Sequence, residues 1–196
     1  MKKLVIASNN AGKLREIGHI LAPLAIEVLP QAQFNVPEAD EPYCTFIENA
    51  LAKARHASRI TGLPALADDS GICVDILNGA PGVYSARFAG EPKSDERNNM
   101  KLLEMLADET NRAAHYYCVM VLVRHADDPQ PLIAEGEWRG EILHEPRGDG
   151  GFGYDPYFYL AEQGMTAAQL PLERKNRISH RSQALAQLLA RLKIAG

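Results

Sequence analysis

Short apolar runs and segments of helical periodicity alternate along the first part of the chain. Residues 3–7 form an apolar run that predicts a buried strand, and Leu14, Ile17 and Leu21 then fall on one face of a helix. Residues 25–30 predict a second short strand. The order strand–loop–helix–strand places a polar loop at the carboxyl end of the first strand, which is where open α/β sheets bind their ligands.

A longer helix is predicted over residues 45–62. Thr45 and Glu48 form the T-x-x-E capping box at its start, and Gly62 with Pro64 ends it. Three segments follow: a strand over residues 71–77, a loop rich in glycine and proline over residues 78–92, and a helix over residues 94–108.

The second part of the chain has longer apolar runs separated by turns. We predict an antiparallel meander over residues 113–126, 131–138 and 139–146, then a glycine-rich loop over residues 147–158 and a final helix over residues 179–196. No linker rich in proline, glycine or serine separates two domains. The pattern predicts an α/β fold in which residues 1–196 form a single unit with a central mixed sheet, and two lobes flank an active-site cleft.

Composition narrows the classes of partner. The chain of 196 residues is 46% hydrophobic and 23% charged, and it is long enough to bury a core without disulfides or metals. Its formal net charge of −4 argues against binding to nucleic acid or to an anionic membrane. The N-terminal apolar run is too short for a signal peptide or a membrane span.

The cysteines and histidines form no disulfide or zinc pattern. Cys44, Cys73 and Cys118 are far apart in the sequence, and the six histidines are scattered. We therefore expect reduced thiols and a cytoplasmic protein.

The polar loop Ser8–Lys13, with the sequence SNNAGK, is the first candidate for chemistry. Backbone N–H groups at a helix start, with a lysine beside them, suit a phosphate. The alternative is a plain turn capped by a serine or asparagine, because the Walker A pattern is absent. The second cluster consists of Glu48, Asn49 and Lys53 on the helix that follows. Glu48 already serves the capping box, and a solvated helix lysine is the alternative to a functional role for Lys53.

Two adjacent carboxylates, Asp68 and Asp69, lie between apolar and small residues. Successive residues of a strand point to opposite faces, so at most one of the two faces a given pocket. A turn before Gly71 is one interpretation of the pair. The other is a Mg²⁺ site, where a carboxylate also orients or deprotonates water.

A basic run lies near the C-terminus of this acidic chain and consists of Arg174, Lys175, Arg177, His180 and Arg181. Ser179 is the predicted N-cap of the last helix, so two of these side chains occupy its first turn. The helix dipole disfavours cations there by about 0.3–1 kcal/mol each. Recruitment for an anion or a base edge accounts for this placement, and a solvated basic face is the alternative.

The segment GGFGYDP, Gly150–Pro156, belongs with the basic run. Its glycines allow close approach of the backbone to a ligand, and Phe152 and Tyr154 offer faces for stacking. Asp155 precedes a proline, which favours extended geometry. The alternative is a tight loop with two core aromatics. Together these clusters indicate a nucleotide enzyme that acts on phosphates.

Six motifs carry a family resemblance: S-x-N-x-x-K (Ser8–Lys13), F-x-E-N-A-x-x-K-A (Phe46–Ala54), A-D-D-S-G (Ala67–Gly71), P-G-V-Y-S-A-R-F (Pro81–Phe88), G-G-F-G-Y-D-P (Gly150–Pro156) and S-H-R (Ser179–Arg181). In this order, and over nearly the whole chain, they closely resemble the inosine triphosphate pyrophosphatase family, whose bacterial members are dITP/XTP pyrophosphatases. The resemblance implies a Mg²⁺-dependent house-cleaning hydrolase that cuts ITP, dITP and XTP into monophosphate and pyrophosphate. It also implies a homodimer of an elongated α/β fold.

The family's site residues are carried onto the matching positions of this chain. The resemblance implies that the triphosphate is held by Ser8, Asn9, Asn10, Ala11, Gly12 and Lys13, with assistance from Lys53. Asp69 would be the catalytic carboxylate and a metal ligand, Asp40 a second metal ligand, and Ser70 a substrate contact. The base would be bound mainly by Phe152, Gly153, Tyr154, Asp155, Lys175, His180 and Arg181.

Donors from His180 and Arg181 would favour the 6-oxo group of hypoxanthine and xanthine over the 6-amino group of adenine. An unmatched buried polar pair costs about 1–3 kcal/mol. Three alternatives stay open: a pyrophosphatase for modified pyrimidines or methylated guanine nucleotides, a nucleotide-binding module without catalysis, and a hydrolase that releases orthophosphate from the γ position.

Overall fold

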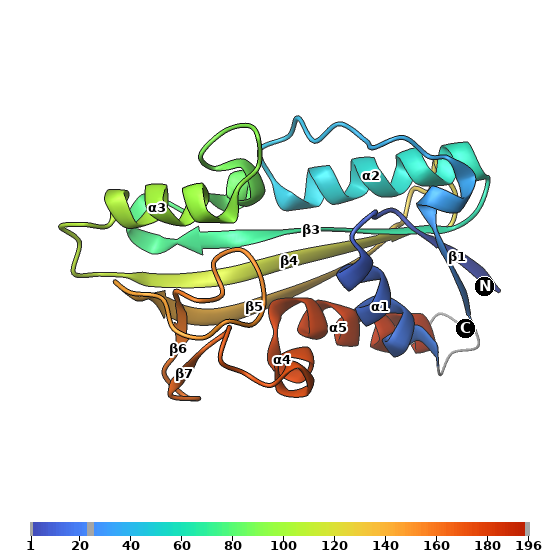
Figure 1. The fold of residues 1–196 in the computed structure, drawn as a ribbon. Coiled ribbons are helices and arrows are strands. Elements are labelled where there is room, and N and C mark those ends of the chain that lie inside the picture. The colour runs from blue at the N-terminus through green and yellow to red at the C-terminus, as the bar shows by residue number, and fades with distance from the viewer. Residues whose placement is uncertain (1, 23–25, 195–196) are drawn as a thin grey trace. The chain divides into compact units, whose positions relative to one another are not determined.

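The computed structural model describes residues 2–22 and 26–194. Its strands form one mixed sheet in the order β2-β1-β3-β4-β5-β6-β7 (Figure 1). Their bounds are β1 Lys3–Ile6, β2 Glu27–Pro30, β3 Ala65–Val74, β4 Ala113–Val123, β5 Leu132–Ile142, β6 Phe158–Leu160 and β7 Met165–Thr166. β1 is parallel to β2 and β3, whereas β6 is antiparallel to β5 and β7. The predicted α/β class with a mixed sheet is confirmed.

Five α-helices and three 3₁₀ turns lie within the described residues. The helices are α1 Ala11–Leu21, α2 Phe46–Thr61, α3 Asp95–Met105, α4 Leu172–Ile178 and α5 His180–Ile194, and the turns are η2 Gln31–Phe34, η3 Asp75–Leu77 and η4 Gly82–Arg87. No helix of the described segments has the length and apolar character that a membrane span needs.

The chain divides into two compact units. The first unit comprises residues 1–69, 118–136 and 181–196, and the second comprises residues 70–117 and 137–180. Each unit has its own hydrophobic core.

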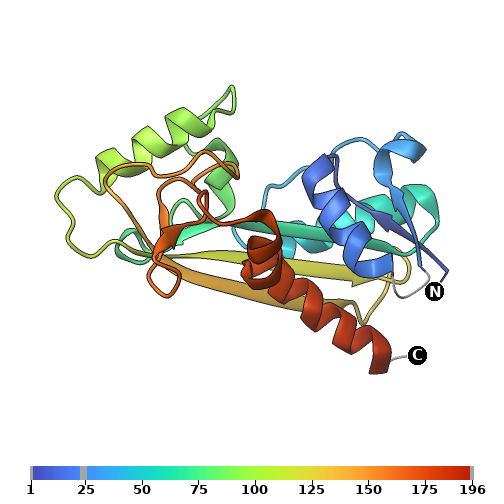
Figure 2. The same cartoon turned by 60° about the horizontal axis from the view of Figure 1, so that its bottom comes forward.

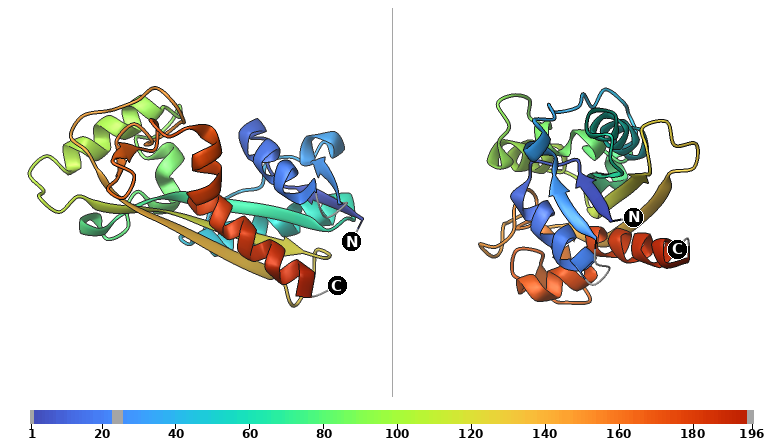
Figure 3. Two further views of the ribbon diagram at one scale, coloured as in Figure 1. Left: turned by 90° about the horizontal axis from the view of Figure 1, so that it is seen from below. Right: turned by 90° about the vertical axis from the view of Figure 1, so that its right-hand side faces the viewer.

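In the first unit, helices cover both faces of the sheet. Figures 1 and 3 show α2 on one face and α1 with α5 on the other. The predicted apolar faces are confirmed, since Ile17 and Leu21 of α1 and Leu185 and Leu188 of α5 are buried in one cluster with strand residues such as Leu66. Side chains on one face of the sheet in this unit therefore contact α2, and side chains on the other face contact α1 and α5.

The core of the second unit is rich in aromatic side chains. Tyr116, Trp138 and Phe158 pack together, with ring centroids 4.7 to 6.4 Å apart. Figure 2 shows the glycine-rich loop (orange) close to α3 (green), and two hydrogen bonds join Gly153 to this helix. The loop is therefore held in place by α3.

Three sequence predictions of secondary structure were wrong, and one helix was not predicted. β3 begins at Ala65 and ends at Val74, so the two aspartates lie inside a strand, and the segment after it is the turn η3. β5 is one strand where two were predicted: Gly140 does not mark a turn, because a Cβ there would lie 2.5 Å from the carbonyl oxygen of Tyr159 on β6. The loop predicted over residues 78–92 contains η4. α4 was not predicted; Ser179 caps its C-terminal end and directly precedes His180, the first residue of α5.

Two predicted segments reach beyond the described residues. Ala25, the predicted start of the second strand, lies outside them, as do residues 195 and 196 of the predicted last helix. β2 is described from Glu27 and α5 as far as Ile194.

Candidate active site

Strand alternation sends the two adjacent carboxylates of β3 to different partners. Asp68 contacts Lys13 of α1 and Arg181 of α5, whereas Asp69 contacts Asn49 and Lys53 of α2. Both aspartates are buried, with 3% and 8% of their surface exposed. The turn interpretation of this pair is wrong, because the cations and the amide let two carboxylates continue inside a buried strand.

Asp68 holds two cations on the α1–α5 side of the sheet. Its Oδ2 lies 2.7 Å from the Lys13 ammonium and 3.6 Å from Nε of Arg181. Burial alone would raise the pKa of Asp68, but the two cations outweigh it and hold the pKa far below its ordinary value. Asp68 is therefore ionised throughout the physiological range, and it fixes the position of Lys13.

The loop before α1 is ordered by its own polar side chains. Asn10 caps the helix, since its Oδ1 accepts hydrogen bonds from the N–H groups of Gly12 and Lys13. The hydroxyl of Ser8 accepts from the N–H of Asn10, and Oδ1 of Asn9 accepts from Gln31. Ala11 begins the helix. The capped-turn interpretation thus describes this loop, and the Lys13 side chain is the cation that the loop presents.

Asp69 is enclosed by a polar cluster on the α2 side. Nδ2 of Asn49 donates to Oδ2 of Asp69 at 3.1 Å, and the ammonium of Lys53 lies 3.8 Å from Oδ1. The same ammonium lies 2.5 Å from Oε1 of Glu41. Asp69 and Glu41 therefore share one cation.

The surroundings of Asp69 and Lys53 raise the pKa values of both side chains. Burial and the nearby Glu41 raise the pKa of Asp69, against the opposing effects of Lys53 and Asn49. Burial would lower the pKa of Lys53, but Asp69, Asp68 and Glu41 together raise it. Lys53 therefore stays protonated, while Asp69 binds a proton more readily than an ordinary aspartate.

The Asp69–Glu41 pair has the donor chemistry of a magnesium site. Mg²⁺ is usually bound by one or two carboxylates, with water and substrate phosphates as its other ligands. Two carboxylates here converge on the Lys53 ammonium, and their mutual repulsion is the kind that a bound cation relieves. The described residues contain no group of three or more His, Cys, Asp or Glu side chains placed to hold a metal alone.

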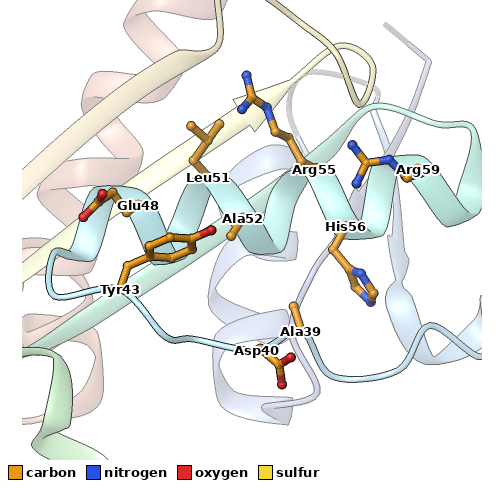
Figure 4. Close-up of a pocket in the computed structure, with 9 residues that line it drawn as sticks. All are labelled: Ala39, Asp40, Tyr43, Glu48, Leu51, Ala52, Arg55, His56 and Arg59. Carbon is orange, nitrogen blue, oxygen red and sulfur yellow. The ribbon is translucent and has the colours of Figure 1, made fainter.

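Asp40 lines a groove of about 490 Å³ along α2 (Figure 4). The groove is lined by Ala39, Asp40, Tyr43, Glu48, Leu51, Ala52, Arg55, His56 and Arg59. Glu41, the next residue, is the one that contacts Lys53. A ligand role for Asp40 stays a prediction, and the geometry favours Glu41 for it.

In the second unit, Asp155 organises the glycine-rich loop. One oxygen accepts a hydrogen bond from the N–H of Phe152 and contacts the Lys175 ammonium, and the other accepts from the hydroxyl of Tyr116. Gly151 has a φ of +75°, and a Cβ there would lie 2.1 Å from this carboxylate. Asp155 is 3% exposed, so its contacts in the structure are to the protein.

The two aromatic residues of the loop are placed differently. Phe152 is 58% exposed and lies under the Lys175 ammonium, 5.2 Å from ring centroid to nitrogen. Tyr154 is 4% exposed, and its hydroxyl donates to the carbonyl of Ser85. Phe152 therefore offers a face for a base, while Tyr154 matches the core-aromatic alternative.

His180 is held by a stack of aromatic rings. Its ring lies 4.8 Å from that of Tyr116 at an interplanar angle of 10°, and 6.4 Å from that of Trp138. His180 and Arg181 open α5, as predicted. Ser70, half-buried on β3, directly follows Asp69.

Sequence reasoning missed the partners of these residues. Asn49 was singled out with Glu48 and Lys53 but was given no role, and neither Glu41 nor Tyr116 was given one, although Asn49, Glu41 and Tyr116 each contact a predicted site residue. The one available signal was Asn49 itself, a polar residue in a helix where small apolar residues are buried at Ala50 and Ala54.

Comparison with known proteins identifies the family. Residues 4–191 match the Ham1 family. The chain is 67% identical over 192 residues to a protein of Nitrosomonas europaea named dITP/XTP pyrophosphatase, covering 98% of this chain and 95% of that protein. A protein of the same name from Chromobacterium violaceum is 66% identical over 191 residues, covering 97% of each chain.

A solved structure agrees with this match. The structure of a HAM1 protein from Coxiella burnetii superimposes with a TM-score of 0.95 at 50% identity, covering 98% of this chain and 99% of that one. On sequence and on fold, the chain belongs to the Ham1 family.

Proposed function

We propose that the protein hydrolyses the triphosphates of deaminated purines, ITP, dITP and XTP, to the monophosphate and pyrophosphate. The observation that carries the proposal is that the two adjacent aspartates of β3 have different partners. Asp68 holds two cations, whereas Asp69 lies among Lys53, Glu41 and Asn49. The names of the relatives, dITP/XTP pyrophosphatase, support the same substrates. Residues 1–196 would act as a single catalytic domain.

The cations of the first unit would bind the phosphates. Lys13 and Lys53 supply positive charge, and Lys13 is fixed by the buried carboxylate of Asp68. Preorganised cations stabilise the charge that develops on phosphoryl oxygens during transfer. Ser8, Asn9, Asn10, Ala11 and Gly12 would complete this phosphate-binding loop.

Asp69 would activate the water. A bond forms between the water oxygen and the α-phosphorus, the bridging bond to the β-phosphate breaks, and pyrophosphate leaves with its electron pair. The proton of the water passes to the Asp69 carboxylate. In the metal-free protein, burial and Glu41 raise the pKa of Asp69, so its carboxylate binds a proton more readily than that of an exposed aspartate.

Asp69 and Glu41 would hold Mg²⁺, with Asp40 as the other candidate ligand. When bound, the ion would neutralise phosphate charge and lower the pKa of water. Two carboxylates fit the preference of Mg²⁺ for a small number of protein ligands.

The base would be bound by residues of the loop and of the α5 start: Phe152, Gly153, Tyr154, Asp155, Lys175, His180 and Arg181, with Ser70 as a further substrate contact. Phe152 is exposed for stacking. N–H donors from His180 or Arg181 would satisfy the 6-oxo group of hypoxanthine and xanthine, and they would oppose the amino group of adenine.

One assay tests the proposal. The protein is incubated with Mg²⁺ and ITP, XTP, dITP, ATP, GTP or dTTP, and pyrophosphate and orthophosphate are measured separately. We expect pyrophosphate from ITP, XTP and dITP. Equal rates on ATP would contradict base selection, orthophosphate as first product would contradict α–β cleavage, and binding without turnover would indicate a nucleotide-binding module.

We further propose a homodimer in the cytoplasm, on the family resemblance described above. Free cysteines are consistent with a reducing compartment. Light scattering coupled to gel filtration measures the assembly state, and a monomer at micromolar concentration would contradict the dimer.

A further inference from the structure

Asn49 of α2 is a buried amide whose hydrogen bonds run to two different parts of the first unit. Its side chain is 1% exposed. Oδ1 accepts from the N–H of Tyr43 at 3.1 Å, and Nδ2 donates both to the carbonyl of Tyr43 at 3.2 Å and to Oδ2 of Asp69 at 3.1 Å. Both donor hydrogens of the amide are therefore used.

These partners fix which way round the amide lies. A flipped amide would set its oxygen against the Tyr43 carbonyl and the Asp69 carboxylate, and its NH₂ group against the N–H of Tyr43. Such a buried mismatch is unfavourable. The donor thus always faces Asp69.

Lys53, one helical turn further along α2, makes a parallel set of contacts. Its ammonium lies 3.8 Å from Oδ1 of Asp69 and 2.5 Å from Glu41. Residues four apart lie on one face of a helix. Asn49 and Lys53 therefore each contact one oxygen of Asp69 and one residue of the segment Glu41–Tyr43.

Neither helix propensity nor core packing explains an asparagine here. Asparagine is a poorer helix former than alanine, and a buried amide is costly unless it is fully hydrogen-bonded. Its neighbour Ala50 is completely buried, so the helix packs small side chains on the sheet at this level. The hydrogen bonds of the amide to Tyr43 and Asp69 account for an asparagine at this position.

We propose that Asn49 is a positioning residue for the proposed reaction, and that it fixes the Asp69 carboxylate and the Glu41–Tyr43 segment relative to each other. With Oδ2 of Asp69 taken by the neutral amide, Oδ1 is directed toward Lys53. This inference rests on the proposed function for its kinetic consequence, but its structural consequence does not depend on it.

A matched control exists on α3. Asn98 occupies the same place as Asn49, four residues after the helix cap, and is also 1% exposed. Its Oδ1 accepts from the N–H of Ala89, and its Nδ2 donates to the carbonyl of Ala86. Within the described residues, Asn98 thus ties a loop to a helix by hydrogen bonds of the same kind, and its side chain bonds only to backbone groups.

The experiment compares Asn49→Ala, Asn49→Asp and Asn98→Ala. Loss of a hydrogen bond to a charged group predicts that Asn49→Ala lowers kcat for ITP by about 10- to 100-fold, with KM changed less than about threefold. Asn98→Ala should lose similar thermal stability and keep kcat within about twofold of the wild type. Asn49→Asp keeps the acceptor for Tyr43 but opposes Asp69 with a like charge, so its kcat should fall at least as far as that of Asn49→Ala.

Amide exchange without metal or substrate gives a second readout. The N–H of Tyr43 should exchange about 5- to 10-fold faster in Asn49→Ala than in the wild type, and at the wild-type rate in Asn98→Ala. If Asn49→Ala does not fold, Asn49→Ser, which keeps one donor, takes its place in the same comparison.

The outcomes separate the inference from the proposed function. Equal kcat losses in Asn49→Ala and Asn98→Ala, or wild-type turnover in Asn49→Asp, would overturn the positioning role. An unchanged Tyr43 exchange rate in Asn49→Ala would overturn it without any activity assay. If the wild type hydrolyses none of the purine triphosphates, the proposed function fails, and the exchange result still decides the structural part.

Discussion

Isosteric replacement of the two adjacent aspartates should change stability in opposite directions. Within the described residues, Asp68 is the only ion-pair partner of the Lys13 ammonium, which lies 2.7 Å from its carboxylate. Asp68→Asn removes this charge, and it also removes the carboxylate that contacts Arg181. Breaking a buried ion pair costs about 3–5 kcal/mol. The Lys13 side chain is 20% exposed, so water compensates in part and the lower value, about 3 kcal/mol, applies.

For a chain of this size, a loss of about 3 kcal/mol corresponds to a fall in melting temperature of about 6–12 °C. Because the pKa of Asp68 is depressed in the folded state, its contribution is fully present above about pH 4, the unfolded value. The contribution is lost only as the pH falls further, toward the folded pKa. Thermal melts followed by circular dichroism at pH 7, without metal, measure the effect.

Asp69→Asn is the control. The raised pKa of Asp69 means that its ionised form costs stability at neutral pH, and an asparagine removes that charge while an oxygen still accepts from Asn49. Its melting temperature should equal or exceed that of the wild type, although turnover is abolished. A melting temperature of Asp68→Asn within about 2 °C of the wild type, or an equal fall in both variants, would refute this reasoning.

Three further outcomes follow from burial and contact. His180→Ala should reduce discrimination between ITP and ATP, measured as the ratio of kcat/KM values, by about tenfold through loss of a base-facing donor; an unchanged ratio would place base recognition elsewhere. Gly151→Ala should raise KM for ITP with a smaller effect on kcat, because its Cβ displaces the Asp155 carboxylate 2.1 Å away; an unchanged KM would contradict that role for the loop. Cys44 should react with a thiol reagent in the native protein, whereas Cys118, whose burial raises its pKa to about 12, should react only on unfolding; a thiol titration with and without urea measures both.

Local signals in the sequence predicted the elements that they specify. Thr45 caps α2 as predicted, since its hydroxyl accepts from the N–H of Glu48, and the same hydroxyl donates to the Glu48 carboxylate at 2.6 Å. Apolar periodicity located α1 and the buried face of α5. In each case the residues that form the sequence pattern, and that make the contacts in the structure, lie within a few positions of one another in the chain.

The wrong predictions involve partners distant in sequence. Two strands were predicted over residues 131–138 and 139–146, where β5 is one strand. The absence of a side chain at Gly140 serves the approach of β6, which comes some twenty residues later and is itself only three residues long. α4 has seven residues and no side-chain cap that a sequence would signal. Such elements form because tertiary contacts stabilise them, and local propensity does not register this.

The site shows the same division. Residue types and motifs singled out Lys13, Asp69 and His180, but not the groups that orient them. The partner of Asp69 lies twenty positions earlier, at Asn49, and the ring beneath His180 belongs to Tyr116. Sequence also could not separate Phe152 from Tyr154, because only the structure shows that one is exposed and the other buried.

Placing two carboxylates side by side makes physical sense once their partners are known. Strand alternation gives each its own cation on a different helix, Lys13 on α1 for Asp68 and Lys53 on α2 for Asp69. The cations around Asp68 compensate its charge. Burial and Glu41 raise the pKa of Asp69, and the ionised Asp68 is not the main cause of this rise. Asp68 can therefore remain charged to hold Lys13, the proposed phosphate-binding lysine, while the next residue keeps the higher proton affinity that its proposed role as general base needs.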